Sequence, residues 1–288
     1  MIDFNKKIDF EKSYDLIIIG NITKDYINDS EQYILGGSSL YAGIASANIG
    51  VNTMIISNHS INHTELPEFE KLQIISSDNE FTTEFLWTYE NDKRSGYLNN
   101  KTKTIDLNFK RKLKTKMLML APVFDEIEIN IKDNFEYETC LLSPQGLLRS
   151  SNSNSKIFLD KNNLQRLICG VHIISCSEEE ENYLYRYPSV ENCFDYISVT
   201  LGYKGSKLYN KYNCTHFPGY IPDKIIDPTG AGDVFSLYLL VFYYKTNNIE
   251  FAVKIANCAA SFVVEGLGIS TIPSFRSVKK RLMENINE

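Results

Sequence analysis

The chain has 288 residues, and its 43% hydrophobic and 23% charged residues are typical of a globular protein with one large domain or two small ones. Its formal net charge of −6 argues against a dedicated nucleic-acid-binding protein, which would carry a basic surface. The apolar run at 234–244 is too short to span a bilayer, and the N-terminal residues lack the apolar stretch of a secretory signal. The six cysteines form no CxxC pair. We therefore expect a cytoplasmic protein with reduced thiols and with no nucleic-acid or membrane partner.

Short apolar runs alternate along the chain with longer, mixed segments. Runs of this kind fit strands that are buried on both faces of a parallel sheet. One of the helical patterns between them starts with a capping box of Ser177 and Glu180, and another ends at Gly50, a typical C-terminal cap. The alternation predicts an α/β fold with helices on both faces of the sheet. Strands are expected at 16–20, 52–57, 117–123, 139–143, 156–160, 171–176 and 195–202, and helices at 38–50, 177–187, 233–244 and 249–265.

Two stretches interrupt this alternation. Residues 22–35 and 81–98 alternate apolar and polar side chains, which is the pattern of a sheet with one solvated face. We interpret them as a small antiparallel appendage and a candidate lid over a site. The Ser/Asn-rich segment 150–155 is expected to be a mobile loop. Because no Pro/Gly linker divides the chain, we expect one domain over residues 1–288 with the lid inserted in it.

The segment IIDPTGAGDVF at 225–235 carries the strongest chemical signal. The first N–H groups of a helix lack internal partners, and glycines let the backbone approach a ligand. Gly230 to Gly232, placed before a helix, therefore predict an anion pocket suited to phosphate. A carboxylate beside this pocket is explained if Asp233 accepts a proton from a hydroxyl group that attacks phosphorus. The alternative is that Asp233 is an N-cap and the glycines form a tight turn.

A second glycine pair, Gly36 and Gly37, precedes the small-residue helix early in the chain. Asp25 lies just past the first strand, at the edge where open α/β sheets bind their ligands. We interpret these residues as a binding site for the hydroxyl groups of a small polyol. Each also has a simpler interpretation, with the glycines as a turn and Asp25 as a surface acid.

Together, these motifs resemble the ribokinase-like, or PfkB-type, carbohydrate kinases over nearly the full length of the chain. DPTGAGD at 227–233 is similar to the C-terminal signature of that family, and the glycine pair with its helix is similar to the N-terminal signature. VTLGYKG at 199–205 resembles the nucleotide-binding stretch, and ANCAASFVVEGLG at 256–268 resembles the helix that closes the adenine pocket. The resemblance implies a three-layer α/β/α fold with a mostly parallel central sheet, helices on both faces and a small β lid.

The resemblance implies an ATP-dependent kinase that uses Mg²⁺ and phosphorylates a hydroxyl of a small sugar, an inositol-like polyol or a nucleoside. Arg149 lies in PQGLLR, which is similar to a divergent branch with inositol-like and nucleoside-like kinases. It would contact the acceptor or a phosphate, or else face solvent. The other implied site residues are Asp233 as general base, Gly230, Ala231 and Gly232 as the anion hole, Asp25, Gly36 and Gly37 for the acceptor, Thr200, Gly202, Gly205 and Asn257 for ATP, Glu180 for indirect Mg²⁺ binding, and Asp227 and Thr229 for a monovalent cation such as K⁺.

Several positions depart from the family pattern. Ser177 replaces the Asn of an Asn-x-x-Glu stretch whose Glu is kept, so magnesium is expected but its water network is in question. Ser38 and Tyr41 stand where ribokinases have Lys and Asn. An aromatic face suits a flat surface, which favours a ring polyol or a nucleoside over free ribose. Trp87 and Tyr89 would extend that surface, or else pack within the lid without touching a ligand.

Two other classes of function are alternatives to the kinase. A nucleotide or sugar sensor would keep the fold without turnover, but a pure binding protein has no need of Asp233 beside a phosphate. A dinucleotide-binding enzyme would need a G-x-G-x-x-G turn after the first strand, and the sequence lacks that turn there. The sequence allows either a monomer or a homodimer formed through the exposed face of the lid.

Overall fold

The computed structural model of the chain describes residues 8–28, 30–62, 70–76, 80–90, 93–127, 131–160, 170–184 and 194–284. The strands of its large central sheet are β1 (Tyr14–Ile19), β4 (Thr53–Ile56), β5 (Gln73–Ile75), β8 (Leu113–Leu120), β9 (Phe135–Glu136), β10 (Thr139–Leu142), β13 (Ile173–Ser177), β14 (Tyr196–Thr200), β15 (Ser206–Tyr209) and β16 (Cys214–Phe217). Their order is β16-β15-β14-β13-β10-β8-β1-β4-β5, with the short β9 paired to β8. The strands from β14 to β5 are parallel, and β15 and β16 extend one edge antiparallel.

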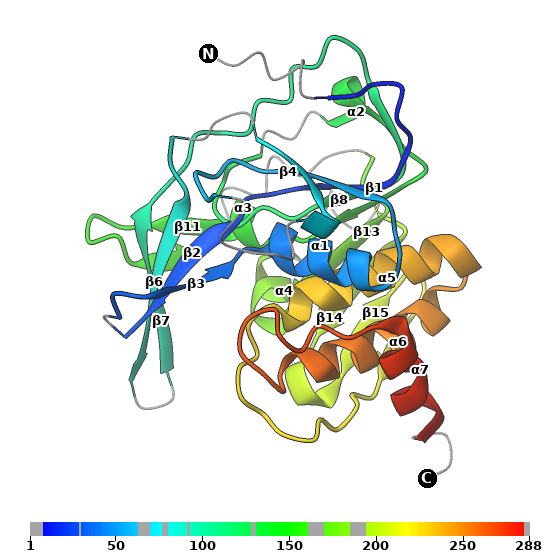
Figure 1. Ribbon diagram of the computed structural model, residues 1–288. Helices are drawn as coiled ribbons and strands as arrows, with labels where there is room; N and C mark the ends of the chain where they lie inside the picture. The colour runs from blue at the N-terminus through cyan, green and yellow to red at the C-terminus, as the bar shows by residue number, and fades with distance from the viewer. Residues whose placement is uncertain are drawn as a thin grey trace.

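Helices cover both faces of this sheet, as Figure 1 shows, so the described chain has three layers. Successive residues of a strand point to opposite faces. In β1, Leu16 and Ile18 join the core on one face, whereas Ile17 and Ile19 join the core on the other. None of the described helices combines the length and the apolar character that a membrane-spanning segment requires. One face is packed by α1 (Ser38–Asn48), α5 (Ala231–Thr246), α6 (Ile249–Val263) and α7 (Phe275–Glu284), and the other by α2 (Ile131–Asn134), α3 (Gln145–Leu148) and α4 (Glu178–Leu184).

The helix ends follow the signals in the sequence. Gly50 adopts a left-handed backbone with φ of 71° just after α1, which is the geometry of a C-terminal cap. At the start of α4, Ser177 N–H donates to Glu180 Oε2 (2.8 Å), and Glu180 N–H donates to Ser177 Oγ (3.3 Å). This confirms the capping box that the sequence predicts.

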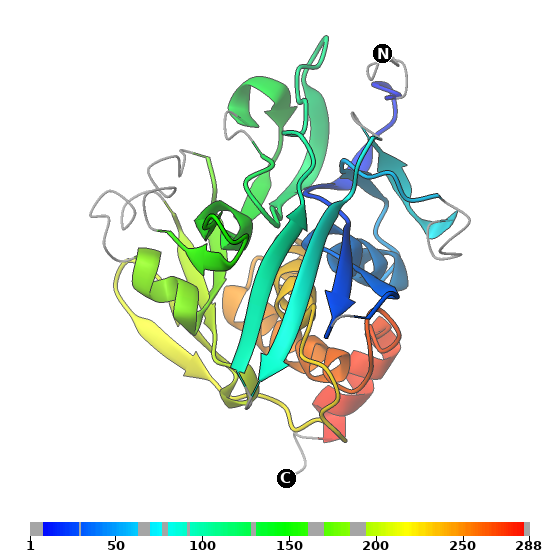
Figure 2. The same ribbon diagram turned by 90° about the vertical axis from the view of Figure 1, so that its left-hand side faces the viewer.

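A second, smaller sheet stands beside the central one. It consists of β2 (Thr23–Ile27), β3 (Tyr33–Gly36), β6 (Thr83–Glu90) and β7 (Lys93–Asn100), in the order β3-β2-β6-β7. Figure 2 views the molecule from the side of this sheet, with β6 and β7 in front. The sequence predicts an antiparallel appendage here. The sheet is in fact mixed, because β2 and β6, which are distant in the chain, pair in parallel.

A β-hairpin follows α3, and it corrects two expectations. Its strands are β11 (Arg149–Ser151) and β12 (Ile157–Leu159), which pair antiparallel. The run 156–160 is therefore not a buried strand of the parallel sheet. Its side chains are at best half-buried, because the hairpin forms a separate two-stranded sheet outside the central one.

The polar segment 150–155 is an ordered turn of this hairpin and not a mobile loop. The Asn152 side-chain oxygen accepts hydrogen bonds from the N–H groups of Asn154 and Lys156, both at 3.0 Å, which closes the turn. The Ser155 carbonyl accepts a hydrogen bond from Leu98 N–H (2.8 Å) in β7. The hairpin is thereby joined to the small sheet.

A buried carboxylate fixes the small sheet to the central one. Glu126 is 1% exposed, and its two oxygens accept hydrogen bonds from the N–H groups of Asn21 (3.0 Å), Val123 (2.8 Å) and Phe124 (2.7 Å). Asn21 follows β1, and Val123 and Phe124 follow β8. The Asn21 side chain donates onward to Thr102 Oγ1 (2.6 Å), which follows β7. Burial raises the pKa of Glu126, and the backbone donors lower it.

We predict that Glu126→Gln destabilises the fold. The amide would place an N–H₂ group where backbone N–H groups now find an acceptor, and an unsatisfied buried donor costs about 1–3 kcal/mol. The free energy of unfolding, measured in denaturant, should fall by about that amount. Glu136→Gln is the control, because Glu136 makes an exposed ion pair with Lys114, and such pairs contribute about 0–1 kcal/mol. Equal losses in the two variants would contradict the role given to Glu126.

Candidate active site

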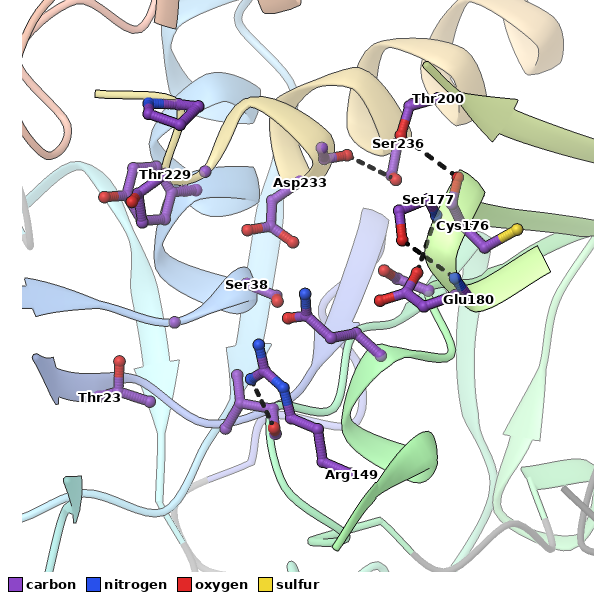
Figure 3. Close-up of a pocket in the computed structure, with 18 of the residues that line it drawn as sticks. Thr23, Ser38, Arg149, Cys176, Ser177, Glu180, Thr200, Thr229, Asp233 and Ser236 are labelled. Atoms are coloured by element: carbon purple, nitrogen blue, oxygen red, sulfur yellow. Dashed lines mark hydrogen bonds between the residues drawn. The ribbon is translucent and has the colours of Figure 1, made fainter. Parts of the chain in front are cut away.

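A cavity of about 250 Å³ lies where β10, β13 and β14 end, between the small sheet and the N-terminus of α5. The carboxyl ends of parallel strands are the usual place for a ligand in an open α/β sheet. Figure 3 shows Asp233, Glu180 and Arg149 reaching into it from three different elements. The sequence-predicted residues on its wall are Asp25, Gly37, Arg149, Glu180, Thr200, Thr229, Gly230, Gly232 and Asp233.

The small sheet supplies one wall of this cavity through its register. Asp25 pairs with Phe85 across β2 and β6, and Trp87 pairs with Gly96 across β6 and β7. Directly opposed residues share a face, and so do residues two apart. Asp25, Phe85, Trp87 and Arg94 therefore lie on the one face that the cavity touches.

Gly96 makes room for the indole ring of Trp87. A Cβ atom at position 96 would lie 2.3 Å from Trp87 Cζ3. The ring lies across β7, and the Arg94 guanidinium carbon sits 3.8 Å from its centroid. Protein therefore packs against part of the Trp87 ring, while the side chain still lines the first cavity, so the aromatic surface considered from the sequence stays a prediction. The side chain of Tyr89 lies outside the described part of the structure.

Gly36 likewise makes room for Asp25. A Cβ atom at position 36 would lie 2.6 Å from Asp25 Oδ2. The Thr23 hydroxyl donates to Asp25 Oδ1 (2.9 Å). Burial raises the pKa of Asp25 to about 6, although Thr23 and two nearby arginines lower it. Asp25 is thus a half-buried carboxylate on the cavity wall and not the surface acid of the simpler interpretation.

The N-terminus of α5 forms the opposite wall. Gly230 is the N-cap, with φ of 83°, and no side chain caps the helix. Asp233 lies in the first turn, so the alternative that it is the N-cap is wrong. Ala231 N–H already donates to Pro228 O (3.2 Å). Within the described chain, the N–H groups of Gly230, Gly232 and Asp233 have no backbone acceptor, so they remain available to an anion.

The Asp233 carboxylate is set up to change protonation near neutral pH. Burial raises the pKa of Asp233 to about 6. The Ser38 hydroxyl and the Arg149 guanidinium lower the pKa, while Glu180 and Asp25 raise it through charge repulsion. A carboxylate with this pKa is mostly ionised at pH 7 and can accept a proton.

Arg149 faces the cavity and not the solvent. It donates to Val123 O (3.0 Å), and its guanidinium carbon lies 5.5 Å from the Phe85 ring and 5.6 Å from the Trp87 ring. The solvent-facing alternative is therefore wrong. Burial lowers the pKa of Arg149, and Glu180, Asp25 and Asp233 raise it. The Arg149 cation thus interacts with all three carboxylates on the cavity wall.

Tyr41 supports the glycine turn and also lines the first cavity. The side chain is 2% exposed, and a Cβ atom at Gly230 would lie 2.1 Å from its ring. The turn before α5 thus packs against the Tyr41 ring, and a stacking role for this ring stays a prediction. Its neighbour Ser38 lies close enough to Asp233 to lower the pKa of that carboxyl.

A second cavity of about 340 Å³ adjoins the first and shares Thr200, Pro228 and Gly232 with it. Its walls are mostly apolar. All four residues predicted to bind ATP line it: Thr200, Gly202, Gly205 and Asn257. Ala231 lines it as well. Gly205 has φ of 94°, and a Cβ there would lie 2.1 Å from Phe217 O, so the loop needs glycine at this position. Asn257 donates to the carbonyls of Phe217 (3.4 Å) and Pro218 (3.3 Å).

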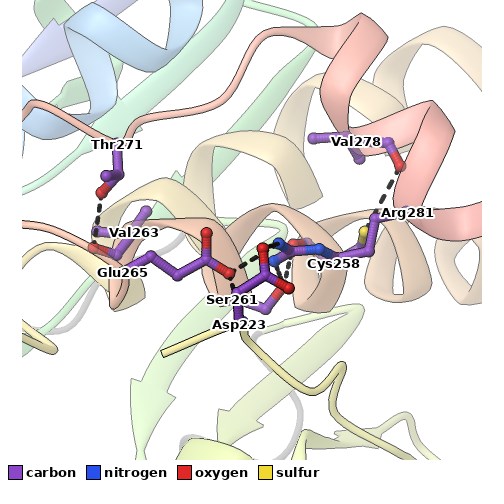
Figure 4. Close-up of polar contacts among 8 residues, drawn as sticks. All are labelled: Asp223, Cys258, Ser261, Val263, Glu265, Thr271, Val278 and Arg281. Atoms are coloured by element: carbon purple, nitrogen blue, oxygen red, sulfur yellow. Dashed lines mark hydrogen bonds and ion pairs between the residues drawn. The ribbon is translucent and has the colours of Figure 1, made fainter. Parts of the chain in front are cut away.

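A buried arginine, Arg281, connects the elements behind this second cavity, and Figure 4 shows its polar contacts. Arg281 of α7 donates to Glu265 Oε1 (2.7 Å) and Ser261 Oγ (2.8 Å), and its guanidinium carbon lies 3.4 Å from the centroid of the Phe262 ring. Glu265 also accepts a hydrogen bond from Asp223 N–H (2.9 Å). The loop that carries Pro222 and Ile225 is thereby held against α6, where those two residues line the cavity.

Asp227 and Thr229, the two residues predicted to bind a monovalent cation, hydrogen-bond to each other inside the turn. Asp227 Oδ1 accepts hydrogen bonds from Thr229 N–H (2.9 Å) and Thr229 Oγ1 (2.7 Å). Asp227 lines neither of the two cavities. The described residues contain no cluster of three or more His, Cys, Asp or Glu side chains that could hold a metal ion. The monovalent-cation site stays a prediction.

Sequence reasoning did not single out several residues of the first cavity. Ser143 and Ser175 lie in or just after strands that end there, so the strand ends could have indicated them. Arg94 could be found only from the register of β6 against β7. The missed residues on the wall are Thr23, Phe85, Arg94, Val123, Ser143, Gln145, Ser175, Cys176 and Ser236.

We predict that Asp233→Asn raises thermal stability at pH 7. The pKa of Asp233 is about 6 in the folded chain, against about 3.9 for a free Asp side chain. Between these two pKa values the folded state therefore binds more protons than the unfolded state. Above about pH 6, Asp233 is charged in the folded chain, and the full free-energy cost of burying that charge applies. The Tm of the variant should exceed that of the wild type at pH 7, and the difference should shrink toward pH 4. Asp15→Asn, which removes an exposed ion pair with Lys116, should show no gain. A lower Tm for Asp233→Asn at pH 7 would refute the prediction.

Comparisons with known proteins agree with this geometry. The family described as pfkB family carbohydrate kinase matches residues 148–274. The nucleoside kinase of Methanocaldococcus jannaschii is 40% identical over 89 residues, which cover 31% of this chain and 30% of that protein. The 5-dehydro-2-deoxygluconokinase of Mesomycoplasma hyopneumoniae is 25% identical over 93% of this chain and 92% of its own length.

Solved structures show the same fold. The crystal structure of the M. jannaschii nucleoside kinase has a TM-score of 0.69 and 20% identity, covering 95% of this chain and all of that one. A pyrophosphate-dependent kinase in the ribokinase family, complexed with a pyrophosphate analogue and myo-inositol, has a TM-score of 0.71 and 16% identity, covering 92% and 99% of the two chains. The three-layer architecture and the glycine turn before α5 are thus accounted for together: the chain has the ribokinase fold, and its residues 148–274 match the pfkB family of carbohydrate kinases, phosphotransferases with an alcohol group as acceptor.

Proposed function

We propose that this protein transfers the γ-phosphoryl group of ATP to a hydroxyl group of a small polyhydroxylated acceptor, with Asp233 as the general base. The observation that supports this most directly is the position of Asp233. Its carboxylate lies in the first turn of α5, beside N–H groups without backbone acceptors, and faces a polar cavity. A proton acceptor and a set of anion donors thus meet at one point.

The acceptor would occupy the first cavity, on the side of the small sheet. Asp25 would accept hydrogen bonds from its hydroxyl groups, and Gly37, whose backbone has φ of 94°, would let it approach the main chain. The names of the similar proteins include a nucleoside kinase, a deoxygluconokinase and a kinase complexed with myo-inositol. The small molecules in these names are all polar and rich in hydroxyl groups.

The nucleotide would occupy the second cavity. The apolar wall contributed by Phe235, Ala260 and Val264 suits a purine base. The shared residues Thr200 and Gly232 would bring the phosphates to the first cavity. A pyrophosphate donor would leave this apolar space empty, so we propose ATP as the donor.

The residues present also fit a magnesium ion held through water. Glu180 is 6% exposed and lies on the cavity wall, and only its Oε2 accepts a hydrogen bond, from Ser177 N–H, among the described residues. Its Oε1 is left to order water molecules. When bound, Mg²⁺ would neutralise charge on the triphosphate.

The proposed reaction uses these groups in sequence. Asp25 and Gly37 orient the acceptor so that one hydroxyl group lies against Asp233. Asp233 takes the proton of that hydroxyl, whose oxygen forms the new bond to the γ-phosphorus as the bond to the β-phosphate oxygen breaks. The N–H groups of Gly232 and Asp233 stabilise the charge on the transferring group. Arg149 would add positive charge on the same side.

We predict that Asp233→Asn folds and binds ATP but loses most turnover. Removal of a general base costs about 100 to 10,000-fold in kcat. In the wild type, kcat/KM should fall below about pH 6, because Asp233, whose pKa is about 6, becomes protonated there. The assay measures ADP release with ribose, myo-inositol and several nucleosides at saturating Mg-ATP, and pyrophosphate is tested in place of ATP.

The matched control is Asp227→Asn. Asp227 is the other carboxylate of the same motif, but it does not line the first cavity. It should keep turnover within about tenfold, against the larger loss of a general base. Wild-type kcat in a folded Asp233→Asn protein would remove Asp233 as the base. Turnover with pyrophosphate and none with ATP would overturn the proposed donor.

We also predict that the small sheet closes over the bound acceptor. Its segments, 22–35 and 81–98, carry Asp25 and Trp87 on the face toward the cavity. A closed site excludes water and limits hydrolysis of ATP. Amide hydrogen exchange in both segments should slow when an acceptor and an unreactive ATP analogue bind together. Exchange that stays unchanged in both segments would show that they are not a lid.

A further inference from the structure

One wall of the second cavity is a loop that buries little apolar surface. The loop of residues 221–226 lies between β16 and the glycine turn before α5, and its Pro222 and Ile225 line the cavity. Its three isoleucines are largely open to solvent, with Ile221 86% exposed, Ile225 70% and Ile226 48%. A segment that buries so little apolar area gains little free energy from its conformation. The position of this wall therefore depends on polar contacts.

Two hydrogen bonds join this loop to the end of α6 in the part of the chain that the structure describes. Ile226 N–H donates to Val264 O (2.7 Å), close to the glycine turn. Asp223 N–H donates to Glu265 Oε1 (2.9 Å), in the middle of the loop and next to Pro222. The position of Pro222, and of the cavity wall that it forms, therefore depends on where the Glu265 carboxylate is held.

Arg281 of α7 holds that carboxylate in place, as Figure 4 shows. The guanidinium donates to Glu265 Oε1 (2.7 Å) and Ser261 Oγ (2.8 Å), and its carbon lies 3.4 Å from the centroid of the Phe262 ring. Two directed hydrogen bonds and a ring contact fix the plane of the guanidinium. Arg281 is 9% exposed and the Glu265 side chain 12%, so salt screens this pair only weakly.

Arg281 itself lies outside the site. Of the residues of α7, all of which the structure describes, none lines either cavity. Both hydrogen-bond partners of Arg281 connect it to the second cavity, because Ser261 lines the cavity and Glu265 binds the loop. One side chain of α7 thus determines the geometry of a wall that the helix does not form.

We propose that Arg281 is a positioning residue for the nucleotide: through Glu265, it keeps residues 221–226 in the conformation that accepts a purine base, without touching the nucleotide. This rests on the proposed function, in which the second cavity holds the nucleotide. A loop that is already ordered does not have to lose conformational freedom when the ligand binds, so the ligand binds more tightly. A loop that occupies the same conformation only part of the time raises the observed Kd in proportion.

A purely structural role would have a different consequence. α7 is also attached to the core through Val278, which is fully buried. If Arg281 served only to attach the helix, its loss would lower the Tm and leave the nucleotide affinity of the folded protein unchanged. If Arg281 positions the loop, the affinity falls as well. The Kd for a nucleotide, measured well below the Tm, therefore separates the two roles.

The experiment is a calorimetric titration of the whole chain with ADP and Mg²⁺, at a temperature well below the Tm of every variant. We expect Arg281→Gln to weaken ADP binding by about 5 to 50-fold, since a hydrogen bond between charged groups that orders the loop is worth about that ratio. The KM for ATP should rise by a similar factor. With the best acceptor of the panel, kcat and the KM for that acceptor should stay within about threefold, because only nucleotide binding is lost.

Three further variants test the path from Arg281 to the loop. Lys280→Gln is the matched control, because Lys280 lies on the same helix and makes an exposed ion pair with Glu284; it should keep the ADP affinity. Arg281→Lys keeps the charge beside Glu265 and so secures a folded variant. It should fall between wild type and Arg281→Gln, because an ammonium lacks the planar fork that reaches two partners. Arg281→Gln combined with Glu265→Gln should bind ADP no more weakly than the weaker single variant, because residues that act as one unit are not additive.

The outcomes separate this inference from the proposed function. Equal ADP affinity in wild type and Arg281→Gln, or an equal loss in Lys280→Gln, overturns the role of Arg281 and leaves the nucleotide site intact. Additive losses in the double variant overturn the path through Glu265. No ADP binding by the wild type overturns the proposed nucleotide site, and the role of Arg281 with it. ADP binding that weakens as expected, without turnover of any acceptor, removes the kinase reaction but supports the role of Arg281.

Discussion

The geometry of the site depends on one buried carboxylate outside it. Glu126 accepts hydrogen bonds from the backbone after β1 and after β8, where the chain leaves the central sheet and no strand partner is left for those N–H groups. Asn21, held by Glu126, also binds Asn58 after β4 and Thr102 after β7. The small sheet is thus tied to three strand ends of the large one. This attachment fixes the position of the small sheet's inner face opposite the N-terminus of α5.

That placement brings like charges together at low dielectric. Asp25 comes from the small sheet, Asp233 from α5 and Glu180 from α4, and burial is the main reason that the pKa of each carboxyl is raised. Arg149 offsets this repulsion, because its guanidinium interacts with all three. The fold accepts an unfavourable charge arrangement here, and such arrangements are typical of sites that move protons.

The glycines of the site have a second physical role. From sequence, Gly36 and Gly230 are understood as places where the backbone comes close to a ligand. In the structure, the space left by the missing side chain is filled by protein: Asp25 at Gly36, the Tyr41 ring at Gly230 and the Trp87 ring at Gly96. The glycines therefore determine where the functional side chains lie. Substituting one of them would move a site residue even if the backbone conformation were unchanged.

The sequence by itself determined six strands of the parallel sheet and the helices α1, α4, α5 and α6, because their apolar patterns and caps act over a few residues, and it determined the chemistry of the segment 227–233. It did not predict β5, the antiparallel edge strands β15 and β16, or α7. It failed at the hairpin of β11 and β12, where a short apolar run has the same local pattern whether or not a core covers it. Only the tertiary structure decided which side chains meet across the cavity. Arg94, Trp87 and Arg149 lie together because of the register of β6 with β7 and the attachment of the hairpin to β7. Register and attachment depend on contacts between segments far apart in the chain, and no local pattern of residues encodes them.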